Sequence, residues 1–357
     1  MVRAALALGA LVWAGTALGF PVTVLVTRPD QPNYRSAVVA AVRGARSWIR
    51  AALSDCRMYT DGATEPLLAA LADAAKRGVD VQVLLERRED RPPAPEQSRA
   101  ARFLEASGAE VRWDSPAVTL HAKFLVVDGR RCVLGSSHWT YSALERSVQV
   151  DLVVDSPALA KVVAAYFDLL WRGELAVVAA LSDPPWPEPC ALPLVDLPKA
   201  RSHREVIPYL LRRAGRTVDL LIYRLGYYPQ YPDSPSNLLL EQLIQAVRRG
   251  VRVRVYLEGG EDFPELAEAN RRAATLLAVH GVQVRLDPVG ATLHAKCLIV
   301  DARDVLVSSA NWSYHSLANN LEAGVAFLGA PELARRLAES FSVLWARGRP
   351  VATPPAG

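Results

Sequence analysis

The sequence predicts an α/β fold built from two homologous halves, each a mixed sheet flanked by helices. A ten-residue phrase at 119–128 recurs almost unchanged at 292–301, and further repeats link 76–86 with 248–258, 108–114 with 281–287 and 167–171 with 341–345. The copies stay 172 to 174 residues apart, so the repeat has the size of a domain. Within each copy, helix-like and strand-like patterns alternate, which is typical of an α/β organisation.

The elements of the first half follow from the periodicity of its apolar residues. We expect helices over 37–50, 65–76 and 99–106, and strands over 79–85 and 110–113. The repeated phrase predicts a strand that turns after its final Asp and returns as a second strand. Each half closes with a helix that ends in Leu-Leu-Trp171 or Val-Leu-Trp345.

The division of the chain follows from the repeat and from two unusual segments. Arg3 precedes an uncharged, mostly apolar run that ends in the small-x-small pattern Ala17-Leu-Gly19, so we expect residues 1–19 to be a cleaved secretory signal, with an N-terminal membrane anchor as the alternative. The stretch 182–190 is too rich in proline for a helix or a central strand. We therefore expect an exported protein with a first half over 20–175, a proline-rich linker over 176–200 and a second half over 201–350.

The composition of the chain indicates the class of protein but does not identify a reaction. The chain has 357 residues, of which 51% are hydrophobic and 22% charged, with a net charge of +4. This balance is typical of a globular protein and is compatible with an anionic substrate. The four cysteines form no CxxC pair and no Cys/His ligand cluster, so no metal site is predicted. Cys132 and Cys297 are expected to be buried thiols, and a pairing of Cys56 with Cys190 stays open.

The repeated phrase carries polar residues in a fixed pattern. Each copy is His-x-Lys followed five positions later by Asp: His121, Lys123 and Asp128, then His294, Lys296 and Asp301. In a strand the His and the Lys share one face, whereas the Asp has the opposite parity and is expected to be structural. The returning strands deliver the segments 135–138 and 308–311 to the same end of each half.

A histidine beside a lysine, present twice, suits substitution at an anionic phosphorus centre. One imidazole attacks the phosphorus, the other protonates the departing oxygen, and two ammonium groups neutralise the non-bridging oxygens. This scheme requires neither a metal nor an organic cofactor. A single histidine in an apolar strand is more often a core residue, but the duplication with a lysine two positions on favours a shared site.

With two HxKxxxxD motifs, the second followed by small residues, an Asn and later a Glu, the chain resembles the phospholipase D superfamily over essentially all of the sequence after residue 19. The resemblance implies two α/β halves related by a pseudo-twofold axis, with one active site between them. It also implies a phosphohistidine intermediate that water or an alcohol resolves, without a metal cofactor. Because one chain holds both motifs, we expect a monomer with no obligatory protein partner.

The resemblance extends residue by residue in the second motif. After His294, Lys296 and Asp301, Asn311 matches the phosphate-binding Asn, and Glu322 matches the acid that orients a histidine.

The first motif departs from the family pattern after its Asp. His138 stands where Asn is expected, and Gln149 stands where Glu is expected and is assigned a structural place in the motif. His138 can still donate a hydrogen bond to a phosphate oxygen. Ser136 and Ser309 are expected to contact the substrate phosphate as well.

The replacement of Glu by Gln149 predicts unequal roles for the two histidines. In superfamily members with two motifs, the orienting acid reaches across to the histidine of the other half. Glu322 is therefore expected beside His121, and Gln149 beside His294. Since a carboxylate on the far ring nitrogen fixes the tautomer and raises the basicity of the imidazole, we expect His121 to be the nucleophile and His294 the general acid.

Three interpretations of the function follow. Export favours a phospholipase D-type phosphodiesterase that hydrolyses or transfers phospholipid head groups. The turn 311–314 and the compact halves resemble nuclease-like members of the superfamily, which cleave DNA or RNA. His138 and Gln149 suggest a catalytically weak protein that binds phosphate or lipid.

Other polar segments are expected to have no part in the chemistry. The loop 87–93 mixes its charges and is expected to be a solvated surface. His203 lacks a repeat partner and is expected to be an ordinary surface or cap residue.

Overall fold

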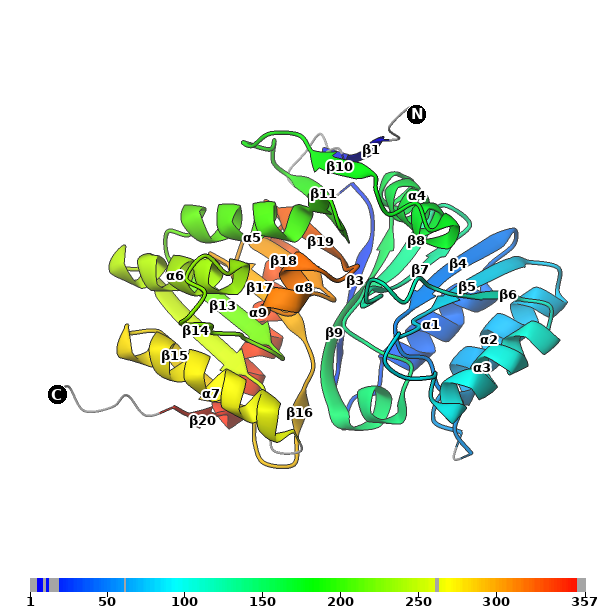
Figure 1. The fold of residues 1–357 in the computed structure, drawn as a ribbon. Helices are drawn as coiled ribbons and strands as arrows, with labels where there is room; N and C mark the ends of the chain where they lie inside the picture. The colour runs from blue at the N-terminus through cyan, green and yellow to red at the C-terminus, as the bar shows by residue number, and fades with distance from the viewer. Residues whose placement is uncertain (1–4, 9–10, 13–18, 61, 261–262, 352–357) are drawn as a thin grey trace.

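Two α/β halves lie side by side and form one molecule (Figure 1). The structure is a computed structural model, and it describes residues 5–8, 11–12, 19–60, 62–260 and 263–351. Each half has a mixed sheet. In the first half β4 (Trp48–Leu53) is parallel to β5 (Asp80–Leu85) but antiparallel to β7 (Lys123–Val127). In the second half β13 (Thr217–Ile222) is parallel to β14 (Arg252–Leu257) but antiparallel to β17 (Lys296–Val300). The predicted α/β fold with two homologous halves is confirmed.

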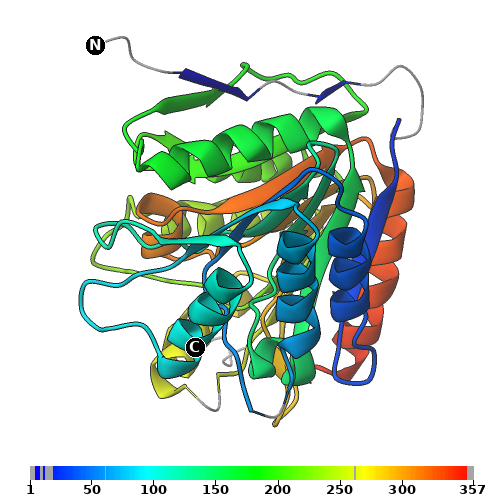
Figure 2. The ribbon, with the colours of Figure 1, turned by 90° about the vertical axis from the view of Figure 1, so that its right-hand side faces the viewer.

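The sheet of the first half has the strand order β9-β8-β7-β4-β5-β6, with β3 paired to β9. Strand β16 (Thr292–Leu293) of the second half extends this sheet by pairing with β9. Its helices α1, α2 and α3 lie side by side on one face (Figure 2), and α4 packs on β7 and β8. The elements are β3 (Val22–Thr27), α1 (Tyr34–Arg43), β4 (Trp48–Leu53), α2 (Glu65–Lys76), β5 (Asp80–Leu85), α3 (Pro95–Ala106), β6 (Glu110–Trp113), β7 (Lys123–Val127), β8 (Arg131–Gly135), a π-helical turn (Ser142–Arg146), β9 (Ser147–Asp155) and α4 (Pro157–Arg172).

The second half repeats this arrangement, with strand order β12-β11-β19-β18-β17-β13-β14-β15-β20. Helix α9 packs on β13, β17 and β18, and also contacts β3 of the first half. The elements are β11 (Cys190–Leu197), β12 (Ala200–Arg201), α5 (Ser202–Arg213), β13 (Thr217–Ile222), α6 (Pro235–Arg248), β14 (Arg252–Leu257), α7 (Pro264–Val279), β15 (Gln283–Leu286), β16 (Thr292–Leu293), β17 (Lys296–Val300), β18 (Asp304–Ser308), α8 (Tyr314–Ala318), β19 (Ala323–Leu328), α9 (Pro331–Arg347) and β20 (Arg349–Pro350).

The two halves share a hydrophobic core. Phe124, Tyr166 and Phe167 of the first half belong to the same buried cluster as Phe327 and Phe341 of the second. A second cluster lies beneath α1, α2 and α3. Because apolar burial is the main stabilising term in folding, a shared core holds the facing edges of the two sheets together. The functional site described below lies along these edges.

Three expected elements differ in the structure. The helix expected over 37–50 ends at Arg43, and residues 48–53 form β4, because Gly44 ends the helix and an apolar run follows. Helix α3 begins at Pro95, four residues earlier than expected, since proline is well suited to the first helical turn. Within the expected linker, residues Cys190–Leu197 form the buried strand β11, which pairs with β19.

All four cysteines are buried free thiols in the structure. Most of the expected signal segment, residues 1–4, 9–10 and 13–18, lies outside the described residues. Its described parts are the short strands β1 (Ala5–Leu8), which pairs with β10 (Val178–Leu181), and β2 (Leu11–Val12), which pairs with β11. No helix in the described part of the chain has the length and apolar character needed to cross a membrane.

Candidate active site

The two His-x-Lys motifs lie close together because a backbone hydrogen bond at each motif joins it to the other half. The amide of His121 donates to the carbonyl of Leu321 at 2.9 Å, and the amide of His294 donates to the carbonyl of Val148 at 2.8 Å. Strand β16 also pairs with β9, which aligns Leu293 with Val148. This reciprocal pairing places His121 beside Glu322, the residue after Leu321. It places His294 beside Gln149, the residue after Val148.

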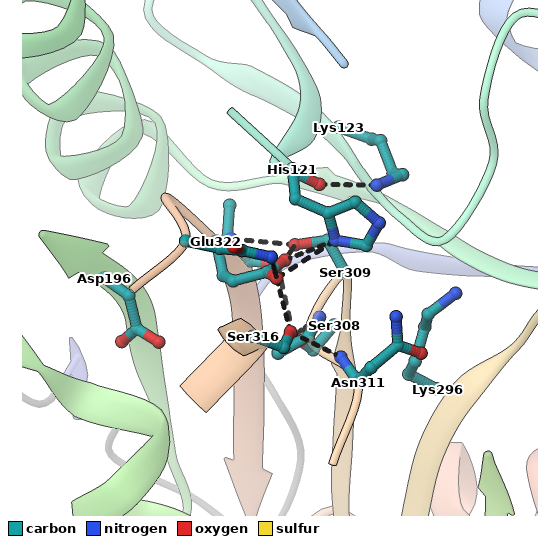
Figure 3. Close-up of polar contacts among 12 residues, drawn as sticks. His121, Lys123, Asp196, Lys296, Ser308, Ser309, Asn311, Ser316 and Glu322 are labelled. Atoms are coloured by element: carbon teal, nitrogen blue, oxygen red, sulfur yellow. Dashed lines mark hydrogen bonds and ion pairs between the residues drawn. The ribbon is translucent and has the colours of Figure 1, made fainter. Parts of the chain in front are cut away.

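His121 faces Glu322 across the boundary between the halves (Figure 3). Its Nδ1 lies 3.0 Å from Oε1 and 2.9 Å from Oε2 of the carboxylate. The glutamate is fully buried, whereas 17% of the His121 side chain is exposed. Since the carboxylate can only accept, Nδ1 carries the proton and Nε2 keeps its lone pair for the substrate.

Glu322 is ionised by its surroundings. Burial opposes its charge, but His121 and Lys123 face it and Ser309 donates to it, so its pKa lies well below the usual value. Ser316 and Asn320 donate to its other oxygen. Burial in turn lowers the pKa of His121, and Glu322 opposes that change. Glu322 therefore supplies the negative charge next to one imidazole.

His294 has a neutral partner in the equivalent place. Its Nδ1 lies 3.1 Å from Oε1 of Gln149 and 3.2 Å from the carbonyl oxygen of Ser136. The Nε2 of Gln149 has no hydrogen-bond partner among the residues that the structure describes. Burial, followed by Lys296, lowers the pKa of His294 well below its usual value. The two histidines thus differ in the charge that faces them.

Both lysines are almost completely buried beside the histidines. Lys123 and Lys296 donate to the carbonyl oxygens of His121 and His294, the latter at 2.6 Å. The Nζ of Lys296 also lies 3.1 Å from the Nε2 of His294. Burial lowers the pKa of Lys123 to about 8 and that of Lys296 as well. Closely packed cationic groups in a dry site attract an anion such as a phosphate oxygen.

The two motif aspartates lie away from the site and close their turns. Asp128 accepts the backbone N–H groups of residues 46, 47 and 48, and Asp301 accepts those of residues 215, 216 and 217. Both residues have φ values near +50°, at 50° and 54°. Each carboxylate ties a hairpin to the beginning of the neighbouring strand, as the parity of the motif predicts.

Ser136 and Ser309 occupy a different place from the one we expected. Both are fully buried behind the histidines. The hydroxyl of Ser136 donates to Oε1 of Gln149 at 2.8 Å, and that of Ser309 donates to Oε2 of Glu322 at 2.5 Å. Their hydroxyls are therefore engaged in holding the side chains that orient the histidines. The expectation that they contact the substrate phosphate is corrected by this geometry.

His138 and Asn311 keep free polar atoms at the site. The ring centroid of His138 lies 5.8 Å from that of His121 and 5.1 Å from that of His294. Neither Nδ1 of His138 nor Oδ1 of Asn311 has a hydrogen-bond partner within the described residues, although both atoms are buried. An unpaired buried polar atom is costly, so these side chains are suited to accept a polar substrate.

Sequence inspection missed several neighbours of the site. Tyr223 packs on His294, with ring centroids 4.6 Å apart, and the ammonium group of Lys296 lies 5.1 Å from the centre of the same ring. The repeat contains a signal for this residue, because Tyr223 directly follows β13 as Ser54 directly follows β4.

A buried polar chain supports the second motif from behind. His203 is completely buried, not a surface residue: its Nδ1 lies 2.9 Å from Asp196 and its Nε2 lies 2.7 Å from the hydroxyl of Ser308. Figure 3 shows Asp196 and Ser308 beside the contacts of Glu322. Because none of the three side chains is accessible, this chain can position the turn after β18 but cannot meet a substrate.

Comparisons with known proteins agree with this geometry. A family model described as the PLD-like domain of cardiolipin synthase matches residues 47–171 and again 208–345. Cardiolipin synthase B of Shigella flexneri is 27% identical over 335 residues, which cover 82% of this chain and 73% of that protein. The 5'-3' exonuclease PLD4 of Mus musculus is 33% identical over 130 residues, 34% of this chain and a quarter of that protein.

A solved structure supports the fold over nearly the whole chain. Phosphatidylserine synthase of Haemophilus influenzae Rd KW20 superimposes with a TM-score of 0.77 at 15% identity, covering 96% of this chain and 89% of that one. The family model matches well over half of the chain, once in each half. The protein therefore belongs to the phospholipase D superfamily, as an enzyme acting on phosphodiesters, with one PLD-like domain in each half.

Proposed function

We propose that the protein cleaves or exchanges phospholipid head groups through a covalent phosphohistidine on His121. The observation that carries this proposal is the unequal pairing of the histidines, with the charged Glu322 on one and the neutral Gln149 on the other. Glu322 orients His121 with Nε2 free and favours the positive charge that develops when this nitrogen attacks.

The proposed reaction has two steps. Nε2 of His121 forms a bond to phosphorus, the bond to the leaving oxygen breaks, and His294 gives its proton to that oxygen. Water then attacks the phosphohistidine and passes a proton back to His294 while the P–N bond breaks. An alcohol in place of water gives transfer instead of hydrolysis. Lys123, Lys296, Asn311 and His138 neutralise or bind the non-bridging oxygens during both steps.

The lipid substrate is favoured by how much of the chain resembles a lipid enzyme. The similarity to cardiolipin synthase B extends over 82% of the chain, whereas the similarity to the exonuclease covers 34%. A nuclease is the second candidate, because the identity to the exonuclease is higher over the part that matches. Export remains a proposal that rests on the apolar N-terminal run.

The test offers purified protein a small chromogenic phosphodiester, phospholipid vesicles, and single- and double-stranded DNA, with EDTA present. We expect turnover of the small diester and of lipid, and loss of both in His121→Ala and His294→Ala. The experiment uses a phospholipid with ³²P in its phosphate and rapid quenching in alkaline SDS, because the P–N bond of a phosphohistidine is stable in base and labile in acid. We expect the label to be trapped on His121. Label on His294 would reverse the assignment of roles, and cleavage of DNA without lipid would establish the second candidate.

A further inference from the structure

A cavity of about 350 Å³ opens beside His121 and has a basic wall. Its lining includes His121 and His138 from the site together with Arg57, Arg88 and Arg91. Arg88 and Arg91 belong to the loop that the sequence led us to expect as plain solvated surface. Three guanidinium groups therefore share one cavity with two imidazoles of the active site.

The duplicated fold explains why His121 is open to this cavity. Strands β4 and β13 occupy equivalent places, so Ser54 after the first corresponds to Tyr223 after the second. The tyrosine ring covers His294, with ring centroids 4.6 Å apart. A serine at the equivalent position is too small to cover His121 and itself lines the cavity. His121 therefore lies open to the cavity, whereas Tyr223 packs on His294.

Two of the arginines correspond to glycines in the other half. Cys56 and Leu225 make equivalent β-bridges to Trp139 and Trp312, so the next residues, Arg57 and Gly226, correspond.

A second pair of backbone contacts aligns the loops after β5 and β14. The amide of Arg87 donates to Asp114 at 2.5 Å, and the amide of Gly259 donates to Asp287 at 2.7 Å. Arg88 therefore corresponds to Gly260. Since the second half folds with glycine at both of these places, the fold does not require the guanidinium groups.

The cavity retains positive charge despite its own carboxylates. Arg57 pairs with Asp55 at 2.8 Å and Arg88 with Asp90 at 2.9 Å, and all four side chains are partly or largely exposed. Such exposed pairs are weak and can exchange partners. Arg91 makes no ion pair within the described residues. Burial raises the pKa of Glu86, the remaining carboxyl in the lining, to about 8, so it adds little negative charge at neutral pH.

We propose that this arginine-lined cavity binds a second anionic group of the phospholipid head group, a phosphate or a carboxylate, while the first phosphate lies between the histidines. Guanidinium groups bind either anion through paired N–H donors. The inference rests on the proposed function and narrows it to head groups that carry two anionic groups.

The test compares short-chain lipids below their micellar concentrations, so that adsorption to a charged surface does not enter. The substrates are cardiolipin with a second phosphate, phosphatidylserine with a carboxylate, and phosphatidylglycerol and phosphatidylcholine with neither. We expect the wild type to prefer one or both of the first two. In the double variant Arg88→Gln/Arg91→Gln we expect kcat/KM for the preferred lipid to fall about tenfold or more, because the second anionic group loses a charge-assisted hydrogen bond. Phosphatidylcholine and the small diester keep their rates.

The matched control is Arg102→Gln, which removes an exposed arginine of α3 outside the cavity lining. An equal loss on all four lipids, or no preference in the wild type, would overturn the proposal. Cleavage of an oligonucleotide that depends on the same arginines, without cleavage of lipid, would assign the cavity to nucleic acid instead.

A binding measurement separates this proposal from the proposed function. Calorimetry with glycerol 1,3-bisphosphate and glycerol 1-phosphate requires no turnover. Tighter binding of the bisphosphate, lost in Arg88→Gln/Arg91→Gln but kept in Arg102→Gln, supports the second anion site even if the small diester is not cleaved. Equal binding of both compounds contradicts the site even if catalysis is normal.

Discussion

Glu322 of the second half holds Nδ1 of His121 in the first, with 2.9 Å between that nitrogen and Oε2, although the two residues are 201 positions apart in the chain. The equivalent contact in the other direction joins His294 to Gln149. Ser309 and Ser136 support the two orienting side chains in the same way. The contacts of the site therefore follow the symmetry of the fold, but the charges do not, because Glu322 is ionised and Gln149 is neutral.

Removal of the Glu322 charge is expected to disable His121. In Glu322→Gln the amide keeps the volume but can present an N–H to Nδ1, which favours the wrong tautomer. We expect kcat on a small phosphodiester to fall on the order of 10³- to 10⁴-fold. The exposed Glu105→Gln in α3 serves as the control. Activity within tenfold of the wild type would remove Glu322 from the mechanism.

The pH dependence of kcat/KM is expected to reflect the protonation of His294, which has the neutral Gln149 as its partner. Burial lowers the pKa of both His121 and His294, so the optimum of kcat/KM should lie on the acid side of pH 6.5. A protonated His294 is needed for the first step, so activity falls as pH rises through its pKa.

Gln149→Glu places a carboxylate beside His294 and favours its protonated form. The descending limb of the profile should move upward by about 1 pH unit or more. An unchanged limb in this variant would show that His294 is not the group that titrates there.

The motif aspartates are expected to affect stability rather than chemistry. Asp128→Asn and Asp301→Asn remove the charge that three backbone N–H groups share, while Asn still tolerates the positive φ. Each variant should lose roughly 1.5–3 kcal/mol in urea denaturation. The exposed Asp73→Asn should lose none. A large fall in kcat of the folded variants would contradict a purely structural role.

His138 is expected to serve as a hydrogen-bond donor to the phosphate. His138→Asn keeps a donor at this place and should retain most of the activity on a small diester. His138→Ala leaves none, and kcat/KM should fall about 10²-fold. Equal activity of the two variants, measured at the optimum pH of each, would exclude the donor role.

Much of the fold could be predicted because it is encoded in local patterns. The strand over 79–85 and the helices that close each half follow from apolar spacing, and the structure has them as β5, α4 and α9. The prediction of a helix over 37–50 was wrong at its C-terminal end. Strand β4 is short and buried on both faces, so its apolar residues continue the helical pattern of α1 without a break. Strand β11 was obscured by the prolines before and within it.

The sequence by itself determined that two equivalent His-x-Lys motifs exist, that Asp128 and Asp301 face away from them, and that Gln149 replaces an acid. These features depend on residue type, spacing and strand parity, all of which are local. Only the tertiary structure decided that Ser136 and Ser309 lie behind the histidines, that His203 is buried, and that arginines from two loops line a cavity beside His121. Such contacts join residues far apart in the chain, and their distances arise from how the two halves pack, which no periodicity records.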